Sequence, residues 1–172
     1  MPSNIILIGF MGSGKSSIGR RIASLNGFRF TDTDDLVVEK AGMPITEIFS
    51  KYGEEHFRDL ETEVLQGLES STGIVLATGG GLALREQNRP LLKRVGRVVW
   101  LDAAPDTLFE RVSRNNRRPL LQTDNPRETF DTLLAFRNSI YEALCDIRID
   151  STTLNHERTA HAVLDSLAKI EE

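Results

Sequence analysis

The sequence is poor in features that mark disulfide-bonded, membrane-spanning or nucleic-acid-binding proteins. Its one cysteine, Cys145, excludes an intramolecular disulfide framework and agrees with a reducing, cytoplasmic compartment. No apolar run is long enough to cross a bilayer, and the stretch from Ile5 to Met11 lacks the basic leader of a signal peptide. The net charge of −4 argues against broad nucleic-acid binding, which usually shows as a basic domain or stripe.

The composition indicates one globular domain. The chain has 172 residues, of which 40% are hydrophobic and 27% charged. This length is sufficient for a hydrophobic core that needs no disulfide or structural metal to stabilise it. Cys145 follows Leu144 and is interpreted as a small apolar side chain rather than a nucleophile, since no activating neighbour is visible. No exposed apolar heptad marks a partner helix, which leaves the oligomeric state open at this point, and we expect a single domain over residues 1–172; the family resemblance given below implies a monomer.

The most informative motif is a glycine-rich run from Gly9 to Ser16, which fits the pattern G-x-x-x-x-G-K-[ST]. The apolar residues 4–8 before it predict a buried strand, and Ile18 and Ile22 after it open a helical pattern. A loop between a strand and a helix can wrap its N–H groups round phosphate oxygens. The alternative, a glycine-rich turn that binds nothing, is disfavoured by this placement.

This loop predicts a nucleotide-phosphate and Mg²⁺ site. Lys15 would reach the β- and γ-phosphates, and the Ser16 hydroxyl would ligate Mg²⁺. The candidate phosphate-binding residues within the loop are Gly12, Ser13, Gly14, Lys15, Ser16 and Ser17.

Strand-like runs alternate with helical patterns along the rest of the chain. The further strands are expected at 28–31, 74–78, 97–101 and 147–150, and the helices at 57–68, 84–94, 105–114, 126–141 and 156–170. This alternation predicts an α/β fold with a parallel sheet covered on both faces, in which ligands gather at the carboxyl ends of the strands.

Two acidic residues follow the second predicted strand. Asp32 and Asp34 can face the phosphate loop together, one holding Mg²⁺ through water and the other accepting a proton from a substrate hydroxyl. Alternatively, one of these acids only caps the helix that begins near Asp35, although Asp35 is the better candidate for the cap.

Three glycines, Gly79, Gly80 and Gly81, follow the third predicted strand. Such a triplet fits a place where a ligand lies against the backbone, or else a tight turn.

Arg58 can pair with Glu61 three residues on, either as a solvated surface bridge or as a preoriented anion clamp, and Arg137 presents the same choice.

The polar segment 113–125 joins two predicted helices and lacks periodicity. With Arg117 and Arg118 it suits a lid that closes over a triphosphate and stabilises developing charge, although a plain surface loop is the alternative.

Together these motifs resemble the shikimate kinases. The resemblance covers nearly the whole chain and rests on the phosphate loop, Asp32-Thr-Asp34, Phe57-Arg58, the triple glycine, 117–121 and Phe136-Arg137. It implies a three-layer, nucleoside-monophosphate-kinase-like fold with a five-stranded parallel sheet in the order 2-3-1-4-5. It also implies Mg²⁺- and ATP-dependent phosphorylation of the 3-hydroxyl of shikimate, in chorismate and aromatic amino-acid biosynthesis.

The resemblance also implies residue roles. Arg58 and Arg137 would grip the shikimate carboxylate, and Asp34 and the Gly80 backbone would bind its hydroxyls. Arg117 would contact the ATP phosphates, while Ser16 and, through water, Asp32 would hold Mg²⁺. The shikimate-binding helices would span about 33–62 and the lid about 113–125, and Phe49 and Phe57 could pack the apolar ring faces.

Other functions are weighed against this one. Another small-molecule kinase of this fold, acting on gluconate or a nucleoside monophosphate, would share the loop. The paired arginines favour an anionic acceptor, so they count against gluconate less than against neutral sugars. A GTPase switch would need an Asn-Lys-x-Asp guanine reader, and no asparagine here precedes a lysine. A non-catalytic nucleotide-binding module would have no reason to keep Asp34, Arg58, Gly80 and Arg137 together.

Overall fold

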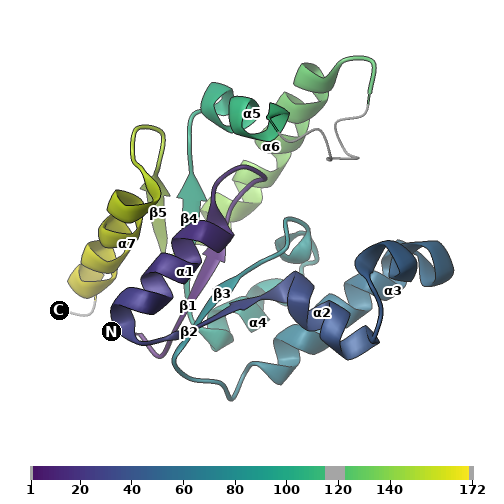
Figure 1. Ribbon diagram of the computed structural model, residues 1–172, viewed down its shortest axis with the longest axis horizontal. Helices are drawn as coiled ribbons and strands as arrows, with labels where there is room; N and C mark the ends of the chain where they lie inside the picture. Colours follow the sequence, from purple (N-terminus) through teal and green to yellow (C-terminus); the bar gives the residue numbers. More distant parts are fainter. Residues whose placement is uncertain (1, 115–122, 171–172) are drawn as a thin grey trace.

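The computed structural model describes residues 2–114 and 123–170, which form a parallel sheet with helices on both faces (Figure 1). The strands are β1 Asn4–Ile8, β2 Arg29–Asp32, β3 Ile74–Ala77, β4 Arg97–Asp102 and β5 Ile147–Asp150. They pair in the order β2-β3-β1-β4-β5, with every pairing parallel, which confirms the predicted sheet.

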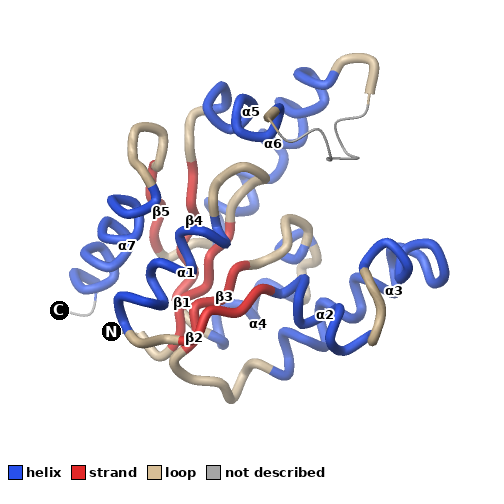
Figure 2. Tube along the Cα trace, viewed as in Figure 1, coloured by secondary structure: helices blue, strands red, loops and turns tan. Residues whose placement is uncertain are grey.

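The helices connect these strands in the alternating order that the sequence predicts (Figure 2). They are α1 Lys15–Asn26, α2 Thr33–Ala41, α3 Ile45–Gly67, α4 Asn88–Val95, α5 Pro105–Ser113, α6 Pro126–Leu144 and α7 His156–Ile170, with a short 3-10 turn, η1, at Leu82–Leu84. None of the helices formed by the described residues is long and apolar enough to span a membrane.

The sheet is buried on both faces because alternate residues of each strand enter different cores. On one face, Ile5 and Leu7 pack with α1 and α7. On the other, Ile6 and Ile8 pack with the C-terminal part of α3 and with α4, α5 and α6. Continuous burial of β1 on both sides explains why its sequence is an unbroken apolar run.

Helix α3 begins earlier than the apolar pattern at 57–68 predicts. It starts at Ile45 rather than at about residue 57, and it contains a kink at Gly53, whose φ of 83° and ψ of 175° are not helical. The first part packs with α2 in a small core around Val37 and Ile48. Helices α2 and α3 therefore form an arm that extends from the edge of the sheet.

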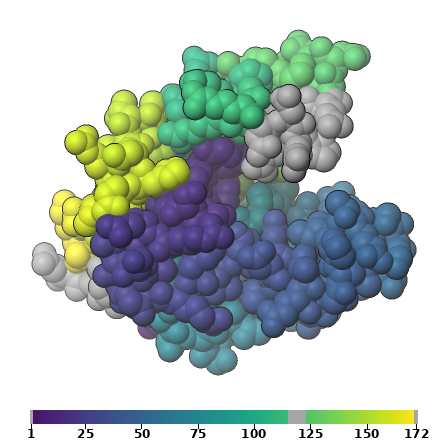
Figure 3. Space-filling model, in the orientation of Figure 1, coloured from purple at the N-terminus to yellow at the C-terminus, as the bar shows by residue number. Residues whose placement is uncertain are grey.

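Helices α5 and α6 form a second projection. The surface between this projection and the arm of α2 and α3 is hollowed (Figure 3). The segment 113–125, predicted as a lid or a loop, joins α5 to α6. Its central residues 115–122, with Arg117 and Arg118, lie outside the described residues.

Candidate active site

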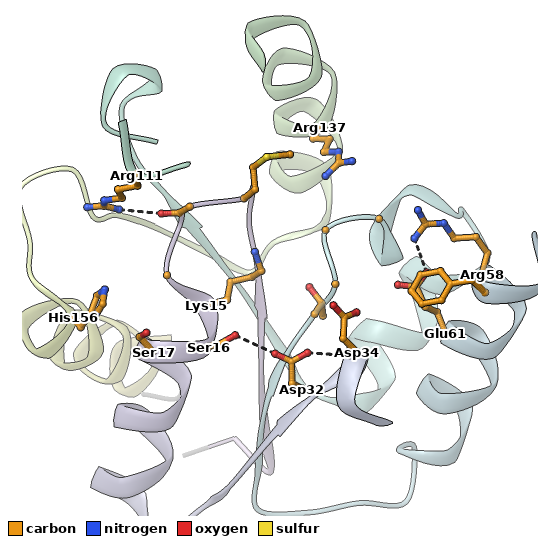
Figure 4. Close-up of a pocket in the computed structure, with 18 residues that line it drawn as sticks. Lys15, Ser16, Ser17, Asp32, Asp34, Arg58, Glu61, Arg111, Arg137 and His156 are labelled. Carbon is orange, nitrogen blue, oxygen red and sulfur yellow. Dashed lines mark hydrogen bonds and ion pairs between the residues drawn. The ribbon is translucent and has the colours of Figure 1, made fainter. Parts of the chain in front are cut away.

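A cleft of about 610 Å³ lies at the carboxyl ends of the strands, where the fold predicts a ligand. Figure 4 shows the residues that line it, which come from the phosphate loop, α1, β2, α2, α3, the glycine turn, α5, α6 and α7. They are Met11, Gly12, Gly14, Lys15, Ser16, Ser17, Asp32, Asp34, Phe57, Arg58, Glu61, Thr78, Gly79, Gly80, Gly81, Arg111, Arg137 and His156.

The phosphate loop folds as its motif predicts. Gly12 and Gly14 have φ of 83° and 85°, in the left-handed region that glycine tolerates, and Gly14 precedes the first turn of α1. The Lys15 ammonium donates to the carbonyl of Gly9 at 2.7 Å and to that of Phe10 at 3.2 Å, so it lies over the loop and lines the cleft. The loop thus presents the N-terminus of α1 and a lysine to the same space.

Asp32 joins the loop to α2. One of its carboxylate oxygens accepts from the Ser16 hydroxyl at 3.1 Å, and the other accepts from the Asp34 N–H at 3.0 Å. Asp32 is therefore the N-cap of α2, so the expectation that Asp35 is the better capping residue was wrong. The reason is that α2 begins at Thr33, directly after the extended backbone of β2.

The carboxyl group of Asp34 faces the cleft from the first turn of α2 (Figure 4). Burial raises its pKa above the ordinary value, the charge of Asp32 raises it further, and the charge of Lys15 opposes the shift. A carboxylate with a raised pKa beside a phosphate loop is suited to accept a proton from a hydroxyl group.

The three glycines lie against three different charged side chains. A Cβ on Gly79 would lie 2.8 Å from Asp34 Oδ1, and one on Gly80 would lie 2.9 Å from Arg137 Nη1. A Cβ on Gly81 would lie 2.6 Å from Arg58 Cζ. None of the three has a positive φ, so the glycines are needed for space rather than for the conformation of a turn.

The Arg58–Glu61 pair is not a solvated surface bridge. The two side chains meet at 2.8 Å, and the Glu61 side chain is only 1% exposed. A second carboxylate, that of exposed Glu54, holds the other side of the guanidinium at 3.1 Å. Burial raises the pKa of Glu61, and its hydrogen bond with Arg58 opposes this effect.

Arg137 is the second cation at this end of the cleft. It is 7% exposed and its guanidinium lies over the ring of Phe10 at 5.2 Å. Among the described residues, its buried Nε has no hydrogen-bond partner. A buried guanidinium with an unused donor beside a cleft is suited to bind an anion.

Two cleft residues were not found from the sequence. Arg111 of α5 donates to the carbonyl of Gly12 at 3.4 Å, and His156 begins α7 on the other side of the loop. Neither lies in a local motif, and only the folded chain brings them to the phosphate loop. Phe57, which was predicted to pack a substrate ring, lines the cleft. Its ring packs against that of Phe49 at a tilt of 38°, with centroids 4.8 Å apart.

Comparison with known proteins agrees with this geometry. The family model for shikimate kinase matches residues 11–168. A shikimate kinase of Thermodesulfovibrio yellowstonii is 41% identical over 167 residues, which are 97% of this chain and 96% of that protein.

Solved structures give the same result. A shikimate kinase from Acinetobacter baumannii, solved in complex with shikimate, has a TM-score of 0.89 and 38% identity, covering 97% of this chain and 93% of that one. A gluconokinase from Sinorhizobium meliloti matches with a TM-score of 0.57 and 24% identity, covering 97% of this chain and 94% of that one. The second likeness shows the fold alone. The sequence and the structure together place the chain in the shikimate kinase family.

Proposed function

We propose that this protein transfers the γ-phosphoryl group of ATP to the 3-hydroxyl of shikimate, giving shikimate 3-phosphate and ADP. The observation that carries the proposal is that one cleft holds a phosphate loop at one end and two arginines at the other. The alternatives fit less well, since a neutral sugar has no carboxylate for Arg58 and Arg137 to bind, and a bare nucleotide-binding module has no acceptor that needs them.

The acceptor would lie between α3, α6 and the glycine turn. Arg58 and Arg137 would bind its carboxylate, because guanidinium groups match that anion with paired hydrogen bonds. The backbone of Gly79, Gly80 and Gly81 would lie along the ring, and Asp34 would contact a hydroxyl. The part of Phe57 that lines the cleft would pack against the apolar side of the ring.

The nucleotide would occupy the other end. The N–H groups of Gly12 to Ser17 would cradle the phosphates, and Lys15 would balance charge on the β- and γ-phosphates. Past the loop, the cleft continues between Arg111 and His156, where the remainder of the nucleotide would extend.

The residues Ser16 and Asp32 fit a Mg²⁺ ion. They supply two hard oxygen atoms 3.1 Å apart, beside the phosphate loop, and a hydroxyl with a carboxylate is a donor set that Mg²⁺ accepts. When bound, the ion would neutralise negative charge on the phosphates. We assign Ser16 as a direct ligand and Asp32 as a ligand through water.

Asp34 would orient the acceptor hydroxyl and accept its proton. Lys15 would supply most of the fixed positive charge that favours the transition state, in a reaction governed by positioning and electrostatics. Arg117 is proposed to join it, although Arg117 lies outside the described residues. The lid over 113–125 and the acceptor-binding segment over 33–62 remain predictions of the same kind.

The proposal extends to the setting of the reaction. We infer that residues 1–172 act as a single kinase domain, as a monomer in the cytoplasm, in the biosynthesis of chorismate and the aromatic amino acids. Its partners would be shikimate and ATP, without nucleic acid or membrane.

The direct test is release of ADP from Mg·ATP by the purified protein, with shikimate, quinate, gluconate, AMP or no acceptor. We expect release that depends on shikimate alone, and the Lys15→Ala protein controls for contaminating activity. Release with another acceptor would overturn the roles of Asp34, Arg58 and Arg137. If no ADP is released with any of these acceptors, the result would favour a nucleotide-binding module.

A further inference from the structure

A tyrosine outside the cleft lining connects two parts of the proposed acceptor site. The hydroxyl of Tyr141 donates to the carbonyl oxygen of Gly80 at 3.2 Å, between residues 61 positions apart in the sequence. Tyr141 lies one helical turn after Arg137 on α6, so both project toward the glycine turn. The bond therefore ties the backbone of the turn to the helix that carries Arg137.

The Tyr141 side chain is held firmly. It is 1% exposed in the core between α6 and the sheet, and its ring lies 6.1 Å from that of Trp100. Burial raises the pKa of its hydroxyl, while the charge of Arg137 and a hydrogen bond with its side chain oppose this shift. The core thus fixes where the hydroxyl lies, and the hydroxyl fixes where the Gly80 carbonyl points.

Side chains pack closely against the glycine turn around this carbonyl. Gly80 has Arg137 beside it, and its neighbours Gly79 and Gly81 have Asp34 and Arg58 beside them, all closer than a Cβ would allow. A rotation of the Gly80 peptide would therefore change the space available to each of these three side chains.

We propose that Tyr141 is a positioning residue for acceptor binding, which acts by holding the Gly80 peptide in register with Arg137. This inference rests on the proposed function, because Gly80 and Arg137 are taken to contact shikimate. The competing explanation is that Tyr141 only fills the core, in which case its ring matters and its hydroxyl does not.

The test is the Tyr141→Phe variant, which keeps the ring and removes one oxygen. Loss of one hydrogen bond of ordinary strength predicts an increase of about 2- to 13-fold in the KM for shikimate. The kcat and the KM for ATP should remain within about twofold, because the lost contact orders the acceptor equally in the ground state and the transition state. The matched control is Tyr52→Phe at the other tyrosine, which is 55% exposed and outside the cleft lining.

The outcomes separate the inference from the proposed function. Shikimate-dependent turnover by the unmodified protein tests the function, and the ratio of KM values between variant and parent tests Tyr141. An unchanged KM for shikimate, or an equal rise in the KM for ATP, would overturn the inference.

A second variant, Gly80→Ala, acts on the same peptide from the other side by crowding Arg137. If both changes act through the Gly80 peptide, the double variant should raise the KM for shikimate by less than the product of the two single effects. Strictly multiplicative effects would show that Tyr141 acts elsewhere, which also overturns the proposal.

Discussion

Replacing Arg58 with alanine should have two separable effects, because Arg58 both faces the cleft and neutralises a buried acid. The first effect is on binding. A charged hydrogen-bonded contact contributes about 1.5–3 kcal/mol, so we expect the KM for shikimate to rise roughly 10- to 150-fold while the KM for ATP changes little.

The second effect is on stability. Without Arg58, the carboxylate of Glu61 would stay buried with neither oxygen paired, since its Oε1 already has no partner among the described residues. Breaking a buried ion pair costs about 3–5 kcal/mol, and we expect the lower end because the Arg58 side chain is 20% exposed and water can enter.

This destabilisation should depend on pH with a defined sign. Burial raises the pKa of Glu61 in the folded protein, and removing Arg58 would raise it further. The folded state then binds the proton more tightly than the unfolded state. The loss of stability should therefore be small at about pH 5 and grow as the pH rises to about 8.

Chemical unfolding at both pH values, together with steady-state kinetics, measures the two effects. In the double variant Arg58→Ala, Glu61→Gln, most of the stability should return while the KM for shikimate stays high. Arg85→Ala is the matched control, because its partners Glu55 and Asp59 are 85% and 59% exposed and its loss should cost less than about 1 kcal/mol. A double variant with a normal KM would refute the binding role, and a fully stable Arg58→Ala protein would refute the account of Glu61.

Three further predictions follow from the site. Lys15→Ala should lower kcat by several orders of magnitude at most without unfolding the protein, and a melting curve that shows loss of the fold would instead make Lys15 structural. The pH profile of kcat/KM should fall on the acid side at a higher pH than an ordinary aspartate gives, because burial raises the pKa of Asp34; an acid limb in the usual aspartate range would contradict this. Gly81→Ala should fold but raise the KM for shikimate, since its Cβ displaces only the flexible end of Arg58. Gly96→Ala should lose stability, since its Cβ would lie 2.8 Å from the backbone carbonyl carbon of Asn4. Equal melting temperatures for the two variants would contradict this comparison.

The fold was predictable where local pattern and burial coincide. The strands at 4–8 and 147–150 and the helix at 156–170 match the expected bounds, and the sheet order agrees with the family resemblance. The start of α3 was missed although Ile45, Ile48 and Phe49 have helical spacing, because the kink at Gly53 separates them from the stripe that begins at Phe57. Phe49 is 39% exposed and Tyr52 is 55% exposed there, and the kink at Gly53 interrupts the helical period.

The site was predictable where its residues lie in one motif, as in the phosphate loop. It was less predictable where one residue has two roles. Asp32 was weighed as either a metal ligand or a helix cap, but its two carboxylate oxygens allow it to bond both Ser16 and the first turn of α2. The sequence shows the acid, while only the geometry shows that the two interpretations are compatible.

The glycine triplet shows most clearly what a sequence leaves open. The run of glycines indicates that something approaches the backbone closely, but the two explanations available were a bound ligand and a tight turn. In the structure the approaching groups are the protein's own side chains, Arg137 beside Gly80 and Arg58 beside Gly81. The backbone behind these arginines limits where their guanidinium groups can lie, and it therefore affects the binding of a substrate that contacts them. For this reason Gly81→Ala, which adds a single methyl group and keeps both arginines, is expected to weaken acceptor binding while the fold persists.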